Sequence, residues 1–156
     1  MRLCDMLAAE RILVDVDGSR VHDKKDALHV LASFIAPVVG SEQTALEQLL
    51  VERERLQSTG IGDGVAIPHT SVETAPGQAA ALILCPRGVP FDSIDGANVN
   101  IIFGVVGPKR ATGEHLRALA RISRLLRDSD VRAKLVASEN PGSAFKLIED
   151  HEATLR

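Results

Sequence analysis

Hydrophobic positions recur at helical spacing in the first third of the chain. Between residues 23 and 40 they lie three and four positions apart, which predicts an amphipathic helix. Asp23 is the expected N-cap, Asp26 occupies the acidic position of a capping box, and Gly40 ends the helix. A second helix follows, with Ser41 or Thr44 as its expected N-cap. Its apolar stripe consists of Leu46, Leu49, Leu50 and Val51.

Short apolar runs in the middle of the chain predict strands. Residues 12–16 alternate and end at a turn, and residues 65–67 form a short buried strand before Pro68. Residues 79–85 and 99–106 are nearly continuous apolar runs, which are typical of central strands.

The last third of the chain is predicted to be helical. Apolar residues between 115 and 126 follow one helix face, and Thr112 is the expected N-cap of a helix that begins near Gly113. A break at residues 128–130 starts a shorter helix, and Pro141 fits the first turn of a last helix. With no repeat or linker in between, the sequence predicts one α/β domain over residues 1–156, with helices available for both faces of a sheet.

Composition narrows the classes of partner. The chain has no Trp, no Tyr and four Phe, so its core is expected to be aliphatic. It lacks the aromatic residues on which single-stranded nucleic acid stacks, and its net charge of −3 gives no basic footprint. We therefore expect no nucleic-acid partner.

The chain has two cysteines, Cys4 and Cys85, which are too few for a disulfide framework and too far apart for a zinc site. Charges lie too early in the N-terminal segment for a signal peptide, and no apolar run approaches the ~18 residues that a membrane helix needs. These features predict a cytoplasmic protein without direct membrane insertion.

His69 is the first candidate for chemistry. It follows a proline and a buried strand, just after a glycine-rich stretch whose N–H groups can point at an anion. A neutral imidazole is a good nucleophile toward phosphorus. On residue chemistry alone, a surface histidine in a turn is the more frequent alternative.

Further candidates lie on both sides of His69. His115 falls in the first turn of the predicted late helix, where anions are favoured, or is simply an exposed helix residue. Arg53 offers a planar fork of donors, or is a solvated charge in the run of residues 52–55. Ser58 and Thr59 offer hydroxyl donors or make local turn bonds.

Other chemistries have less support. His69 and His115 lack a third ligand with convincing spacing, so no metal site is expected. Cys85 follows an apolar run and is expected to be a buried, inert thiol.

Three segments together resemble a known family. Residues 53–69 read RERLQSTGIGDGVAIPH, residues 90–96 read PFDSIDG, and His115 precedes a leucine on the late helix. The first segment closely resembles the signature of fructose/mannitol-type enzyme IIA domains of the bacterial phosphoenolpyruvate-dependent phosphotransferase system, which include the nitrogen-regulatory enzyme IIA. The first motif is long and specific, and the other two are weak alone.

The resemblance implies a site and a fold. His69 corresponds to the histidine phosphorylated on Nε2 by HPr or a nitrogen-branch paralogue, His115 to the second active-site histidine, and Arg53 to the arginine that supports the phosphorylated state. A mixed, roughly five-stranded sheet flanked by helices on both faces is expected, with no cofactor and no metal. The expected phosphate-binding positions are Ser58, Thr59, Gly64 and Thr70.

Two departures from the family pattern are present. Thr70 stands where a small residue such as glycine is frequent, and we expect its hydroxyl to be tolerated or to reach the phosphate. Cys85 and Pro86 resemble the cysteine loop of an enzyme IIB domain but lack the rest of that motif, so a second phosphorylation site is not expected.

Three functions are compatible with this site. In the first, phosphorylation of His69 regulates a target such as a kinase or a transporter. In the second, His69 passes its phosphate to the cysteine of a separate IIB protein. The absence of fused IIB and membrane domains favours the regulatory output. A metal-binding or small-ligand-binding protein of the same fold is the third alternative.

Overall fold

Strand β6 (Val99–Pro108) is the centre of the sheet in the computed structural model, which describes residues 2–154. It pairs antiparallel with β5 (Ala79–Val89) on one side. On its other side it pairs parallel with β3 (Val65–Ala66) and then with β4 (His69–Val72), which are separated by Ile67 and Pro68. The two long apolar runs of the sequence are therefore neighbours in the middle of the sheet, as their hydrophobicity predicts.

Two outer strands complete a mixed sheet of six strands. Strand β1 (Ile12–Val14) pairs parallel with β5, and β2 (Gly60–Gly62) forms an antiparallel hairpin with β3. The order is β1-β5-β6-β3-β2, with β4 beside β6. The α/β class with a mixed sheet is confirmed, and the strand number is six rather than about five.

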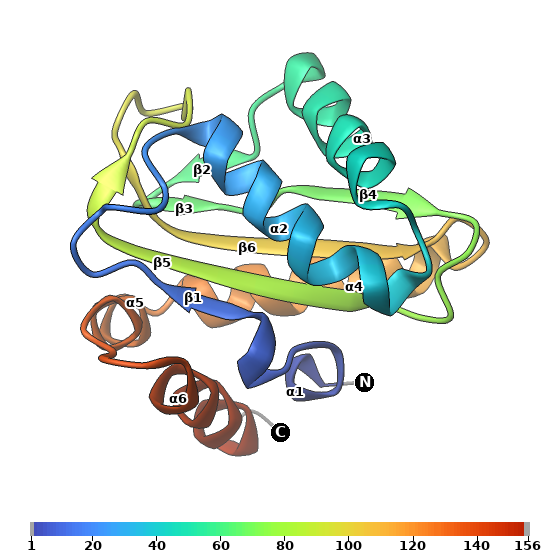
Figure 1. Cartoon of the computed structure of the whole chain (residues 1–156). Helices are drawn as coiled ribbons and strands as arrows, with labels where there is room; N and C mark the ends of the chain where they lie inside the picture. The colour runs from blue at the N-terminus through green and yellow to red at the C-terminus, as the bar shows by residue number, and fades with distance from the viewer. Residues whose placement is uncertain (1, 155–156) are drawn as a thin grey trace.

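Helices cover both faces of the sheet, as predicted (Figure 1). One face carries α2 (Lys24–Val39) and α3 (Gln43–Leu56). The opposite face carries α1 (Leu3–Met6), α4 (Thr112–Leu126), α5 (Ser129–Val136) and α6 (Pro141–Thr154). A 3-10 turn (Ala9–Arg11) leads into β1.

Alternation along the central strands divides the core into two layers. Ile83 and Ile102 point toward α2 and α3, whereas Leu82 and Phe103 point toward α4, α5 and α6. All four are fully buried. The core is mainly aliphatic, as the composition predicts: Phe91 and Phe103 are buried in its two layers, Phe34 and Phe145 pack partly buried against them, and the other buried apolar side chains named in these layers are not aromatic.

The ends of α2 follow the sequence closely. The Asp23 carboxylate accepts from the backbone N–H of Asp26, and Gly40 has the left-handed conformation, with φ of 68°. The reciprocal bond differs from a capping box, because the Asp26 carboxylate accepts from the N–H of His22 rather than of Asp23.

The predicted N-caps of two other helices were wrong. Glu42 is the N-cap of α3, and the Ser41 hydroxyl donates to the Glu42 carbonyl instead of capping the helix. Thr44 lies inside the first turn of α3. At α4, a turn in which the N–H of Ala111 donates to Pro108 brings Ala111 to the N-cap position. Thr112 is therefore the first helical residue, and its side chain makes no capping bond.

The first strand is shorter than predicted. Asp15 is buried, and its carboxylate accepts from the N–H groups of Arg20 and Val21. The N–H of Asp15 still donates to the Leu84 carbonyl of β5, and this turn then draws the chain away from that strand. A short polar side chain that bonds nearby backbone competes with strand pairing in this way.

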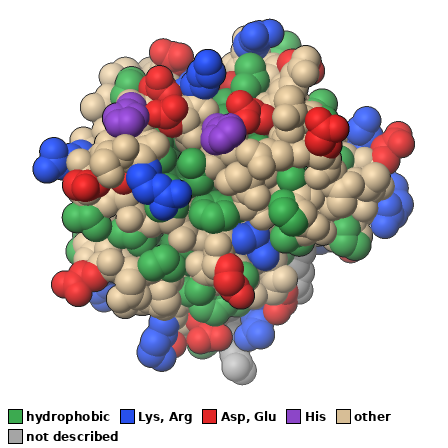
Figure 2. Space-filling view, viewed as in Figure 1, with side chains coloured by type: hydrophobic (Ala, Val, Ile, Leu, Met, Phe, Trp, Pro, Cys, Tyr) green, Lys and Arg blue, Asp and Glu red, His purple; other side chains and the backbone are tan. Residues whose placement is uncertain are grey.

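The surface of the molecule mixes both signs of charge on the face shown in Figure 2, with no continuous area of one sign there. Among residues 2–154, no helix is long and apolar enough to cross a membrane.

Candidate functional site

His69 opens β4 and pairs with Val105 of β6. The sequence predicted that the strand would end at Ile67, but Pro68 only interrupts the pairing, because its carbonyl still accepts from the N–H of Val105. Val65 and Ile67 point toward the layer that contains α4. Alternation continues this orientation, so the half-buried His69 side chain also lies on the α4 side.

The ring of His69 has one orientation and one neutral tautomer. Its Nδ1 lies 2.8 Å from the carbonyl oxygen of Ile67. Since a carbonyl only accepts hydrogen bonds, Nδ1 carries the proton, and the lone pair of the neutral ring is on Nε2. The backbone two residues earlier in the chain thus fixes the ring and leaves the lone pair of Nε2 free.

Burial favours the neutral form of His69. Loss of solvent is the largest effect and lowers its pKa below the ordinary histidine value, while the hydrogen bond to the Ile67 carbonyl acts in the opposite direction. The Arg53 charge lowers the pKa, and the Glu54 carboxylate raises it, each by less. The net lowering favours the form of the ring that has a free lone pair.

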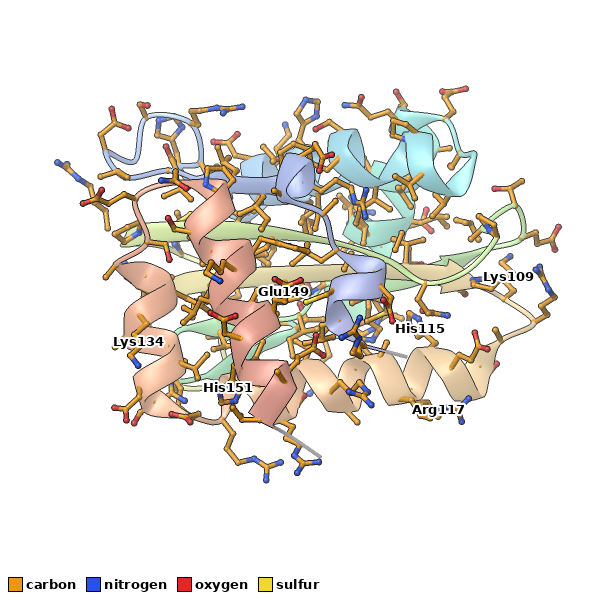
Figure 3. All side chains as sticks on the ribbon, turned by 90° about the horizontal axis from the view of Figure 1, so that it is seen from below. Lys109, His115, Arg117, Lys134, Glu149 and His151 are labelled. Carbon is orange, nitrogen blue, oxygen red and sulfur yellow. The ribbon has the colours of Figure 1, made fainter. Side chains whose placement is uncertain are left out.

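His115 lies in the first turn of α4 and faces His69. The ring centroids are 5.7 Å apart, and the ring planes are inclined at 51°. Figure 3 shows His115 pointing toward the sheet, whereas Arg117, two residues further along the helix, points away from it. Burial, and then the neighbouring His69, lower the pKa of His115. Its Nδ1 lies 2.8 Å from Oε1 of Gln78.

Arg53 reaches the same site from the opposite side of the sheet. It lies in the last turn of α3, and its Nη1 donates to the carbonyl of Gln57 at 2.9 Å. Arg53 and His69 line one open cavity of about 280 Å³. The sequence left open that Arg53 is a solvated charge in the run of residues 52–55. Arg53 is instead half-buried where it lines this cavity.

The hydroxyl groups of Ser58 and Thr59 are already used inside the protein. Ser58 donates to the carbonyl of Phe91 at 2.9 Å and accepts from the N–H of Gly60. Thr59 is buried and donates to the carboxylate of Glu54. Both residues line the cavity, but their hydroxyl hydrogens point into the fold.

Gly64 and Thr70 are not gathered around His69. Gly64 lies in the turn of the β2–β3 hairpin with φ of 75°, and a side chain there would meet Asn100. Val65, next to Gly64, pairs with Ile101 of β6, whereas His69 pairs with Val105. These two positions on β6 are four residues apart, which corresponds to about 13 Å along the strand. Thr70 follows His69 in the strand, so its side chain points to the other face.

The structure therefore brings His69, His115 and Arg53 together and gives the glycines of residues 60–64 a structural role. The Asp63–Gly64 turn needs positive φ angles at both positions, which explains the glycine without an anion.

Sequence reasoning missed Gln78 and the apolar rim of the cavity. Gln78 carries no local signal, because its contact with His115 spans 37 residues. Two exposed hydrophobic side chains line the cavity, Ile61 and Ile94, with exposed fractions of 51% and 73%. Leu56 and Leu116, which are 83% and 61% exposed, follow Arg55 on α3 and His115 on α4.

The other candidate groups lie apart from this site. Cys85 is buried, and burial together with the nearby Asp15 raises the pKa of its thiol to about 12, which confirms the prediction of an inert thiol. His22 and His29 are exposed and contact Asp26 and Glu47. Within residues 2–154, no three His, Cys, Asp or Glu side chains are grouped so as to hold a metal ion.

The fold is that of an enzyme IIA domain. The family model described as "Phosphoenolpyruvate-dependent sugar phosphotransferase system, EIIA 2" matches residues 6–151, and the chain belongs to this family. Within it, the chain is 36% identical to a nitrogen regulatory protein of Bradyrhizobium diazoefficiens over 154 residues, which is 99% of each chain.

The chain is also similar to a solved nitrogen regulatory structure and to a sugar-transport protein. The crystal structure of the nitrogen regulatory protein IIA-Ntr from Neisseria meningitidis superposes with a TM-score of 0.85 at 27% identity, covering 94% of this chain and 98% of that one. The fructose-specific EIIABC component of Bacillus subtilis is 26% identical over 152 residues, which is 97% of this chain and 24% of that protein.

Proposed function

We propose that the chain is a cytoplasmic phosphohistidine protein that accepts a phosphoryl group on Nε2 of His69 and signals through its phosphorylation state. The observation that carries the proposal is the contact between Nδ1 of His69 and the Ile67 carbonyl. It leaves Nε2 as the nucleophile of a half-buried ring that has His115 and Arg53 as neighbours.

The donor in this proposal is a phosphohistidine of HPr or of a nitrogen-branch paralogue. The Nε2 lone pair of His69 attacks phosphorus as the bond from phosphorus to the donor nitrogen breaks, and that bonding pair returns to the donor ring. Both partners are imidazoles, so the reaction is nearly balanced. No metal or cofactor enters this step.

Such a transfer depends on positioning and on charge around the phosphoryl oxygens. The Arg53 guanidinium supplies a permanent positive charge on one side of His69. His115, 5.7 Å away between ring centroids, supplies a nitrogen on the other side. The hydroxyls of Ser58 and Thr59, which donate into the fold, have no part in this proposal.

The surroundings of the site suit a protein partner. The cavity is open, and Ile61 and Ile94 at its edge are exposed. Exposed apolar side chains grouped beside a polar site are typical of a protein-binding surface. A phosphocarrier protein can dock there and bring its own histidine to Nε2 of His69.

The test is phosphorylation with purified components. The full chain is incubated with phosphoenolpyruvate, enzyme I and HPr, and an acid-labile increase of one phosphate is sought by intact mass. His69→Ala should show no increase. His22→Ala, which alters an exposed histidine paired with Asp26, is the matched control and should behave like the unmodified chain. Absence of phosphate on the unmodified chain, or its retention in His69→Ala, contradicts the proposal.

Similarity to nitrogen regulatory proteins over the full length favours the regulatory output, with a kinase or a transporter as the kind of target. A second function is supported by the sugar-transport relative: transfer of the phosphate to a cysteine of a separate IIB protein. Addition of purified IIB proteins to the phosphorylated chain separates the two. Rapid loss of phosphate to a IIB cysteine supports transport, and stable phosphate supports signalling.

A further inference from the structure

Gln78 is an unassigned polar residue in contact with the site. It lies just before β5, and its Oε1 is 2.8 Å from Nδ1 of His115. The other end of its amide, Nε2, is buried and has no hydrogen-bond partner among the described residues. An unpaired buried amide costs free energy, so this placement calls for an explanation.

Gly107 makes the room that Gln78 occupies. A Cβ atom at Gly107 would lie 2.2 Å from both Nε2 and Oε1 of Gln78. The amide therefore lies directly against the backbone of β6, in space that only glycine leaves free. The contact between Gln78 and His115 is held by the sheet and is unlike the mobile pairing of two surface side chains.

We propose that Gln78 is a positioning residue for phosphoryl transfer: by pairing with Nδ1 of His115, it directs Nε2 of His115 toward the phosphoryl group on His69. The negative charge of that group favours binding of a second proton from solvent by His115, and Nε2–H then donates to a phosphoryl oxygen. This inference rests on the function proposed above. Gln78 itself does not touch the reacting atoms. It acts on His115 as the Ile67 carbonyl acts on His69, so each ring of the pair is held by its Nδ1.

The amide suits this task better than a carboxylate does. A carboxylate on Nδ1 would favour the imidazolium form of His115 at rest and place a negative charge near the incoming phosphate. The neutral amide orients the ring without either effect. His69 is the titratable group that faces His115, and its ring lowers the pKa of His115.

The first test observes His115 in the unphosphorylated full chain by ¹⁵N NMR of the histidine rings. In the unmodified protein we expect the Nδ1–H tautomer. Gln78→Ala should give a mixture of tautomers, and Gln78→Glu should raise the pKa of His115 by about 1–2 units. Gln48→Ala, at an exposed glutamine of α3, is the control and should change neither.

The second test measures transfer from phospho-HPr. Gln78→Ala should lower kcat about tenfold through misplacement of His115, with KM for the donor nearly unchanged. Gly107→Ala, which displaces the amide without removing it, should reproduce the loss, and circular dichroism checks that both variants fold. Unchanged tautomer and unchanged kcat in Gln78→Ala would overturn the inference while the proposed function stands. Failure of the unmodified chain to accept phosphate would overturn both.

Discussion

The rings of His69 and His115 lie 5.7 Å apart between centroids, and each is held through its Nδ1: His69 by the Ile67 carbonyl and His115 by Oε1 of Gln78. Both Nε2 atoms are thereby left for the space between β4 and α4. The two rings come from segments 46 residues apart, so the sheet and helix packing bring them together. The orientation of both rings is therefore set in the absence of a phosphoryl group.

The first prediction concerns pH. Because burial lowers the pKa of both His69 and His115, both should titrate below the ordinary value of about 6.5 in NMR titrations of the ring protons. Phosphate acceptance by His69 should then persist to lower pH than for an unperturbed histidine and fall as Nε2 becomes protonated. A pKa at or above 6.5 for both rings would contradict the orientation of the site described above.

The same shifts have a consequence for stability. A histidine with a lowered folded-state pKa binds protons more readily in the unfolded chain. The contribution of the pair to stability should therefore be complete above about pH 6.5 and be lost as the pH falls through the folded-state pKa values. Urea unfolding between pH 5 and pH 8 measures this, and the double variant His69→Asn/His115→Asn should show a weaker pH dependence.

The second prediction separates the two histidines. His115→Ala should retain the phosphate acceptor, because His69 and its contact with Ile67 are untouched. Transfer should slow by about 10²-fold, since one group that stabilises the phosphoryl oxygens is missing. Stopped-flow or quench-flow transfer from phospho-HPr measures the rate. Arg117→Ala, on the outward side of α4, is the control, and equal rates for the two variants would contradict the role of His115.

Much of the fold could be predicted from hydrophobic periodicity. The helices between Asp23 and Leu56 and the strands β5 and β6 are long and strongly patterned, so local sequence identifies them. Strand β4 was missed because it begins after Pro68 and contains polar residues. Its extended form comes from pairing with β6, which local sequence does not encode.

The candidate site was predictable to a different degree for each residue. Resemblance identified His69, His115 and Arg53, and the structure places these three together. Gly64 was assigned to anion binding, but its hairpin turn requires the glycine for backbone reasons. Gln78 left no trace in the sequence, because only the packing of β5 against β6 and α4 gives it a partner.

The third prediction concerns Arg53. Its charge lowers the pKa of His69, so Arg53→Gln should raise that pKa, observed by NMR, and slow transfer to His69. Arg55→Gln, at an exposed arginine of the same helical turn, is the matched control and should leave both unchanged. A lower pKa of His69 in Arg53→Gln, or an unaltered transfer rate, would count against an electrostatic role.

The fourth prediction concerns Glu54, a buried carboxylate behind the site. It accepts from the N–H and the hydroxyl of Thr59 and forms an ion pair with Lys24 at 3.2 Å. Glu54→Ala leaves a buried N–H and a partly buried ammonium without this partner, so it should lower the free energy of unfolding by about 2–4 kcal/mol. Glu52→Ala, at an exposed position two residues earlier, should change it by less than about 0.5 kcal/mol. Urea denaturation followed by circular dichroism compares the two variants, and equal midpoints would show that the Lys24–Glu54–Thr59 connection does not stabilise the fold.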